Sequence, residues 1–222
     1  VSPTLDLRNA DVQLIATGDG SLAHRVVGDG PDVVFVHGWP LHGMTWRNIV
    51  PLVAAEGYRC HVFDLPGTGS SKWSTSTSFS VPDHARRIEQ ALATLGLGSV
   101  ALVGHNSGSA IARYVAGAMG ASAWANVVAG SEIPDHHPLL LKGMLLAGRL
   151  PGRRLGFRTL LRTRVLRHSA MGFGACFVDM RCAEGEFHRL FAEPLIRDDR
   201  AFAGQMGLVQ DWDWAATDNL RE

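Results

Sequence analysis

The chain has 222 residues, of which 46% are hydrophobic and 19% are charged. This composition suits one compact domain with an inserted subdomain and has too little charge for a disordered chain. Lys and Arg together number 21, as do Asp and Glu, so the formal net charge is zero. The sequence therefore has no global basic field to recruit nucleic acid, and no apolar run reaches the roughly 18 residues of a membrane-spanning helix.

Residue 12 to residue 129 alternates short apolar runs with segments of helical periodicity. The β-branched run at 32–36 is typical of a strand covered on both faces, and Gly18-Asp19-Gly20 indicates a hairpin turn. Regular alternation of strands and helices predicts an α/β fold with a mostly parallel sheet and helices on both faces. The expected strands cover 12–17, 23–27, 32–36, 59–64, 100–103 and 124–129, and the expected helices cover 45–56, 82–95 and 107–119.

Groups that bind cofactors or metals in other proteins lack the necessary spacing here. The three cysteines match neither a zinc site nor a Cys-x-x-Cys pair, and His136 and His137 are adjacent, so their side chains point apart. The glycines at 67 and 69 belong to neither a P-loop nor a dinucleotide fingerprint. We therefore expect no cofactor and no metal. Unpaired thiols without a signal-peptide pattern favour a cytoplasmic protein.

Three of the predicted strand ends carry motifs. They read His37-Gly38-Trp39-Pro40, then Asp-Leu-Pro-Gly-Thr-Gly-Ser-Ser at 64–71, and then Gly-His-Asn-Ser-Gly at 104–108. Ligands in open α/β sheets bind at the carboxyl ends of the strands. In this order the motifs resemble the α/β-hydrolase family, closely over residues 10–133, and most of all its epoxide hydrolases and dehalogenases. The resemblance implies a nucleophile elbow at the third motif and an oxyanion hole made by the backbone N–H groups of Trp39 and Ser107.

The spacing of glycines selects the residue at the centre of the elbow. The turn requires small residues two positions before and two after the nucleophile, and Gly104 and Gly108 frame Asn106 in this way. The alternative, Ser107 as nucleophile, would place His105 at a small position, where its ring would clash with the helix. We expect Asn106 at the start of a helix with a strained backbone, at the base of a pocket under the insert.

Asparagine at this position departs from the family pattern, because an uncharged carboxamide cannot attack carbon as an ionised Asp can. Either an Asp has been changed to Asn to trap an inactive enzyme, or the chain is a natural homologue that has lost or changed its chemistry. Glu132 follows the strand at 124–129 and takes the place of the triad acid in some family members. A surface or N-cap role for Glu132 is the alternative.

The resemblance also implies a domain division and a missing part. We expect an α/β-hydrolase core at 1–132, a helical cap insert at 133–210, and the start of a return to the core at 211–222. The last strands and the general-base His of the family are not found in the sequence. We therefore expect an exposed sheet edge that pairs with a second copy or with a separate C-terminal piece.

The insert gives limited information on the substrate. Its arginines and Lys142 form either a solvated helix face or an entrance for anionic substrates, since no acidic residue occurs between Asp135 and Asp179. It has no tyrosine, whereas epoxide hydrolases use cap tyrosines to hold the epoxide oxygen. The expected function is hydrolysis of a small, largely apolar epoxide, halide or ester. The alternative is a non-catalytic binding or scaffold protein that keeps the pocket.

Overall fold

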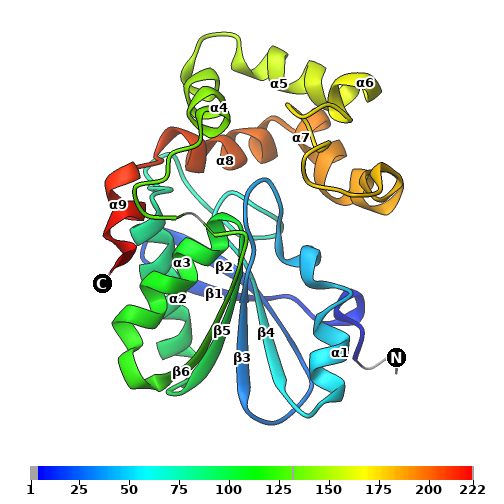
Figure 1. Cartoon of the computed structure of the whole chain (residues 1–222). Coiled ribbons are helices and arrows are strands. Elements are labelled where there is room, and N and C mark those ends of the chain that lie inside the picture. Colours follow the sequence, from blue (N-terminus) through cyan, green and yellow to red (C-terminus); the bar gives the residue numbers. More distant parts are fainter. Residues whose placement is uncertain (1–4, 132, 222) are drawn as a thin grey trace.

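The computed structural model describes residues 5–131 and 133–221 and confirms the α/β fold (Figure 1). Within these residues the sheet has six strands in the order β1-β2-β4-β3-β5-β6. The hairpin of β1 and β2 is antiparallel to β4, whereas β4, β3, β5 and β6 run parallel. The strands are β1 (Gln13–Thr17), β2 (Gly20–Val27), β3 (Asp32–Val36), β4 (Arg59–Asp64), β5 (Val100–His105) and β6 (Ala123–Ala129).

Helices cover both faces of this sheet, which explains the continuous apolar run of β3. Val33 and Phe35 pack in the cluster on the side of α1 (Val50–Ala55). Val34 and Val36 pack in the opposite cluster, with α2 (Val81–Thr94) and α3 (Ser107–Met119). Successive side chains of a strand point to opposite faces, so a strand between two helical layers must be apolar at every position.

One expected helix differs from the structure. The helix expected at 45–56 is divided into a 3-10 turn, η3 (Gly43–Trp46), and the short helix α1, which has Pro51 in its first turn. Proline lacks the N–H that a continuing helix needs, so it starts a new helix here. The expected strand at 124–129 is β6, which lies at the edge of the sheet among the described residues, with Val127 and Val128 54% and 46% exposed.

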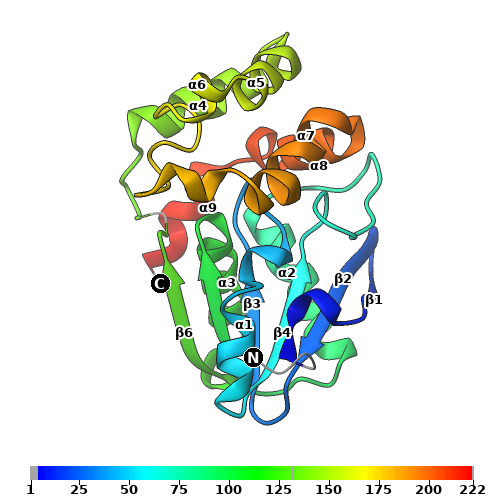
Figure 2. The ribbon, with the colours of Figure 1, turned by 90° about the vertical axis from the view of Figure 1, so that its right-hand side faces the viewer.

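The helices that follow β6 lie above the carboxyl ends of the parallel strands (Figures 1 and 2). They comprise α4 (Leu139–Arg149), α5 (Arg153–Arg162), α6 (Arg164–Arg167), η5 (Met180–Ala183), a π-helical turn η6 (His188–Ala192), α7 (Glu193–Arg197) and α8 (Asp199–Gln210). Of these, α8 lies close to the strand ends, and α4 to α6 form the layer farthest from the sheet. In the described residues, no helix has the length and apolar character to cross a membrane.

The chain then returns to the core beside α3. Helix α9 (Trp214–Asp218) is followed by the 3-10 turn η7 (Asn219–Arg221). The Tyr114 hydroxyl of α3 donates a hydrogen bond to the Ala216 carbonyl at 2.6 Å. His137 contacts the Asp218 carboxylate at 3.0 Å, so the two ends of the helical segment 133–218 lie together.

Candidate active site

The turn between β5 and α3 places Asn106 at its apex, as the N-cap of α3. Its backbone has φ 55° and ψ −136°, a positive φ that non-glycine residues rarely adopt. Such a conformation costs on the order of 1–3 kcal/mol and persists only where the surrounding structure enforces it. Asn106 therefore has the helix-start position and the strained backbone that the glycine spacing predicts.

The surrounding glycines show what enforces this turn. A Cβ atom on Gly104 would lie 2.6 Å from Ser109 Cα, and one on Gly108 would lie 2.4 Å from the Val36 and His37 carbonyl oxygens. Real Cβ atoms do not approach other atoms so closely. Strand β5, helix α3 and the end of β3 thus meet at contact distance, and the two positions that exclude side chains lie symmetrically about Asn106.

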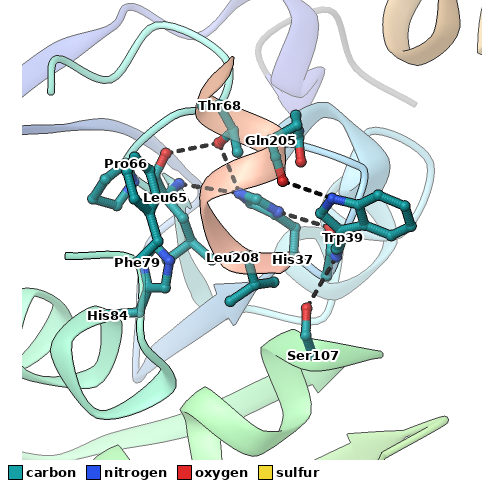
Figure 3. Close-up of a pocket in the computed structure, with 12 residues that line it drawn as sticks. His37, Trp39, Leu65, Pro66, Thr68, Phe79, His84, Ser107, Gln205 and Leu208 are labelled. Atoms are coloured by element: carbon teal, nitrogen blue, oxygen red, sulfur yellow. Dashed lines mark hydrogen bonds between the residues drawn. The ribbon is translucent and has the colours of Figure 1, made fainter. Parts of the chain in front are cut away.

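Two backbone N–H groups converge beside Asn106, and side chains of the turn already accept hydrogen bonds from both. Trp39 N–H donates to Ser107 Oγ at 3.0 Å (Figure 3). Ser107 N–H donates to Asn106 Oδ1 at 2.6 Å. Ser107 N–H lies at the start of the 13-residue helix α3, where the helix dipole favours negative charge. A substrate oxyanion can bind to these donors only if the two side-chain oxygens move away.

His37 holds the first two motif loops together and is not placed to act as a base. Its ring is buried, with Nε2 accepting from Leu65 N–H at 3.0 Å. Nδ1 therefore carries the proton and donates to the Gly38 carbonyl at 3.1 Å. Burial lowers the pKa of His37 to about 4, so the ring is neutral near pH 7. Both ring nitrogens are used in fixing the loop that presents Trp39 N–H.

Asp64, at the end of β4, is a second organising residue that sequence reasoning did not single out. Its fully buried carboxylate accepts hydrogen bonds from Gly43 N–H at 2.8 Å and Ser70 N–H at 2.9 Å. The Arg25 guanidinium lies 3.3 Å from the same group. A Cβ on Gly69 would lie 2.1 Å from Asp64 Oδ2, which explains the glycine in this loop. A carboxylate directly after a buried strand was the available sequence signal.

Helix α8 closes the site from above. The indole Nε1 of Trp39 donates to the Gln205 carbonyl at 2.8 Å, and Gln205 Nε2 donates to the Leu41 carbonyl at 2.8 Å. Gly67 and Gly204 pack backbone to backbone, since a Cβ on Gly204 would lie 2.4 Å from the Gly67 carbonyl oxygen. Sequence reasoning missed this contact, although glycines at 204 and 207 inside a helix were a signal of close approach.

The cavity left beneath α8 is small, about 10 Å³, which is room for one water. Ser107 lines this cavity, but Asn106 does not, contrary to the expectation that Asn106 forms the base of the pocket. Figure 3 shows the core and α8 side chains that surround it. The main contributors are His37, Trp39, Thr68, Ser107, Gln205 and Leu208.

The ring of His105, the other candidate side chain in the turn, does not face the two N–H donors. The ring of His105 packs edge-on against Trp46 with ring centroids 6.4 Å apart, and burial lowers its pKa. Glu132 lies outside the described residues. Within residues 5–131 and 133–221, no histidine ring is hydrogen-bonded to Asn106 or Ser107. The described site thus contains the turn and the two N–H donors, without a base beside them.

A mostly parallel sheet whose strand ends hold a strained turn, an adjacent pair of N–H donors and an overlying helical layer is the arrangement of an α/β hydrolase. The model of the alpha/beta hydrolase fold family matches residues 31–167, and the chain belongs to this family.

Curated relatives of several activities share parts of the chain. A pimeloyl-[acyl-carrier protein] methyl ester esterase of Aeromonas hydrophila is 42% identical over 29% of this chain and 25% of its own length. Non-heme chloroperoxidase CPO-A1 of Kitasatospora aureofaciens is 34% identical over 58% and 46%. A soluble epoxide hydrolase of Corynebacterium is 34% identical over 44% and 34%. The chain thus spans under half the length of these relatives.

Solved structures extend the likeness in fold to nearly the whole chain. The epoxide hydrolase CorEH has a TM-score of 0.69 at 17% identity, over 94% of this chain and 74% of its own. Haloalkane dehalogenase DbeA of Bradyrhizobium elkani has a TM-score of 0.66 at 23% identity, over 91% and 69%. At these identities the likeness establishes the fold.

Proposed function

We propose that the chain is the core and cap of a hydrolase that attacks a small, largely apolar epoxide, halide or ester from position 106. We propose further that asparagine there prevents the covalent step. The observation that carries this is the geometry of Asn106: a strained apex residue whose Oδ1 accepts from Ser107 N–H at 2.6 Å at the start of α3. This is a position shaped for a carboxylate.

An aspartate has the same shape as asparagine, so its two oxygens would take the places of Oδ1 and Nδ2. One oxygen would keep the hydrogen bond from Ser107 N–H, and the other would be free to attack. With a haloalkane, that oxygen forms a bond to carbon while the carbon–halogen bond breaks and halide leaves. The asparagine amide nitrogen has no available lone pair for this displacement.

The proposal is tested by comparing the natural chain with Asn106→Asp and with Asn106→Ala as the matched control. Each protein is incubated with a bromoalkane, a terminal epoxide and a p-nitrophenyl ester, and peptides are analysed by mass spectrometry. We expect a stoichiometric adduct at residue 106 in Asn106→Asp alone. It accumulates because the described residues place no histidine beside position 106 to activate water.

Two outcomes would contradict the assignment of the nucleophile. An adduct on the natural chain that Ser107→Ala abolishes would move the nucleophile to Ser107. Absence of any adduct on a folded Asn106→Asp chain, at concentrations that saturate binding, would reject position 106.

The occupied N–H donors support a second candidate, a non-catalytic binding homologue. Side chains of the turn accept hydrogen bonds from both of the donors that a substrate oxyanion would need. In this case an apolar ligand would bind in a calorimetric titration, whereas Asn106→Asp would form no adduct with any probe. Binding together with adduct formation would instead support the hydrolase.

A further inference from the structure

The outer layer of the helical segment has apolar side chains that the fold does not bury. Leu145 and Gly148 lie on the inward side of α4 and are buried. A Cβ on Gly148 would lie 2.3 Å from Val209 of α8, so the two helices are in close contact there. In α5 the inward side chain is Leu161. These contacts account for the attachment of both helices, so the apolar residues on their opposite sides require another explanation.

We call the exposed side chains of this outermost helical layer, from Leu139 to Val165, the outer cap face. Its apolar members are Leu139, Leu146, Leu150, Leu155 and Val165. Leu139, Leu155 and Val165 are 85%, 73% and 78% exposed. Leu139 and Leu146 are seven residues apart, which places them on one side of α4, and Leu150 follows as the C-cap of this helix. Figures 1 and 2 both show these helices as the layer farthest from the sheet. Clustering of this kind marks an interaction surface.

The charge on this face is of one sign. Lys142, Arg162 and Arg164 are exposed, and the structure records no carboxylate within 4.0 Å of them among the residues it describes. The other cap arginines differ, since Arg154 and Arg158 pair with Asp199 and the buried Arg167 pairs with Glu184. Asp199 of α8 and Glu184 thus neutralise three of the cap arginines, whereas Lys142, Arg162 and Arg164 have no carboxylate partner among the described residues.

From this arrangement we infer that the outer cap face docks the protein on an anionic lipid bilayer. Helices that lie in the plane of a membrane interface bury an apolar stripe among the acyl chains and place Lys and Arg against lipid phosphates. Helix α4 has this pattern, with Leu139 and Leu146 on the stripe and Lys142 at its flank. Because the formal net charge is zero, the chain as a whole is not drawn to an anionic surface, and the proposed attraction comes from the unpaired cations of this face.

The experiment uses the whole chain and vesicles of phosphatidylcholine, with or without phosphatidylglycerol, in a sedimentation assay at low and high salt. We expect binding to the anionic vesicles, little binding to phosphatidylcholine alone, and weakening by salt. The double variant Arg162→Glu/Arg164→Glu should bind at least about tenfold more weakly, since each cation near an anionic surface contributes about 1 kcal/mol. Leu146→Ser/Leu155→Ser should also lose binding.

Leu52→Ser is the matched control, because Leu52 is an exposed leucine on α1, away from the cap. It should bind as the natural chain does. Circular dichroism and the single variant Leu155→Ser distinguish loss of docking from loss of folding. Equal binding to both kinds of vesicle, or no binding to either, would overturn the inference. So would a dimer in the absence of lipid that Leu146→Ser/Leu155→Ser dissociates, because the face would then be an interface between copies.

Discussion

The backbone and the side chain of Asn106 have separable roles. Gly104 and Gly108 enforce the backbone conformation by contact distance, and asparagine is among the residues that tolerate a positive φ. The turn therefore keeps its shape whether residue 106 is ionised or neutral. The geometry of the turn therefore supports residue 106 as the proposed position of the nucleophile. The turn does not depend on whether the side chain there is a carboxylate or an amide.

Alanine substitution of two glycines in α3 tests the first half of this argument. Gly108→Ala should lower the free energy of unfolding by about 1–3 kcal/mol, because its Cβ would meet the Val36 and His37 carbonyl oxygens at 2.4 Å. Gly117→Ala, in the same helix with nothing within 4 Å, should raise it by about 0.5–1 kcal/mol. Urea unfolding measures both. Similar effects of the two substitutions would mean that the elbow can relax.

At the scale of the secondary-structure elements, the arginines between 149 and 167 follow one another closely in the sequence but have different partners in the structure. Arg158 pairs with Asp199 and lies over the Phe202 ring at 5.5 Å, and Arg149 donates to the Gln210 and Trp212 carbonyls. These arginines hold α4 and α5 to α8. None of the cap arginines is among the residues that line the cavity beneath α8. An entrance for anionic substrates thus finds no support in the geometry of this cavity.

Strand β6 leads to a prediction about association. Its outer edge has no strand partner in the described part of the chain, and Val127 and Val128 are exposed. Unpaired N–H and C=O groups on an uncharged strand favour pairing with another chain. We expect concentration-dependent self-association in sedimentation velocity, weakened at least about tenfold by Val128→Lys, because edge lysines oppose strand pairing.

Val26→Lys supplies the control for this experiment. Val26 is 40% exposed but lies on β2, where it pairs with His61 of strand β4 inside the sheet. The variant Val26→Lys should therefore show the same concentration-dependent self-association as the unsubstituted chain. A compact monomer at every concentration, with cooperative unfolding, would show that β6 needs no partner.

For the whole molecule, buried histidines set the response to acid. Burial lowers the pKa of His24 and His37 to about 4 and that of His84 to about 3. The neighbouring His61 adds to the effect on His24, and Arg87 adds to that on His84. Histidines in the unfolded chain titrate near 6.5. Between these values only the unfolded state takes up the proton, so protonation favours unfolding.

These three neutral histidines therefore make their full contribution to the free energy of unfolding above about pH 6.5, and this contribution is lost as the pH falls toward 4. Between these pKa values, the free energy of unfolding should fall by about 1.4 kcal/mol per pH unit for each histidine as the pH is lowered. Urea unfolding at successive pH values measures it, and His84→Leu should reduce the slope by about one residue's share. The pKa values of Asp19 and Asp32 are lowered by Arg87 and Arg59, so their contribution is lost at lower pH. A flat profile from pH 6.5 to 4.5 would refute the prediction.

The sequence by itself determined the elements of the core and the frame of the turn. The strands at 32–36 and 59–64 and the helix at 107–119 have the predicted bounds, because burial on both faces demands unbroken apolar runs between turn residues. The spacing of Gly104 and Gly108 was sufficient to place Asn106 at the apex, since the need for small residues there is local. The domain boundaries and the catalytic roles stay predictions.

Only the tertiary structure decided how the site is closed and which surfaces remain open. Gly204 meets Gly67, and Trp39 reaches Gln205, through the path of the chain in space, which the spacing of residues does not record. The same path pairs Asp199 with Arg154 and Arg158 and leaves Arg162 and Arg164 exposed. Local patterns specify strands and helices because those depend on near neighbours. The hydrogen bond from Trp39 N–H to Ser107, the cavity beneath α8 and the outer cap face depend on contacts between distant segments.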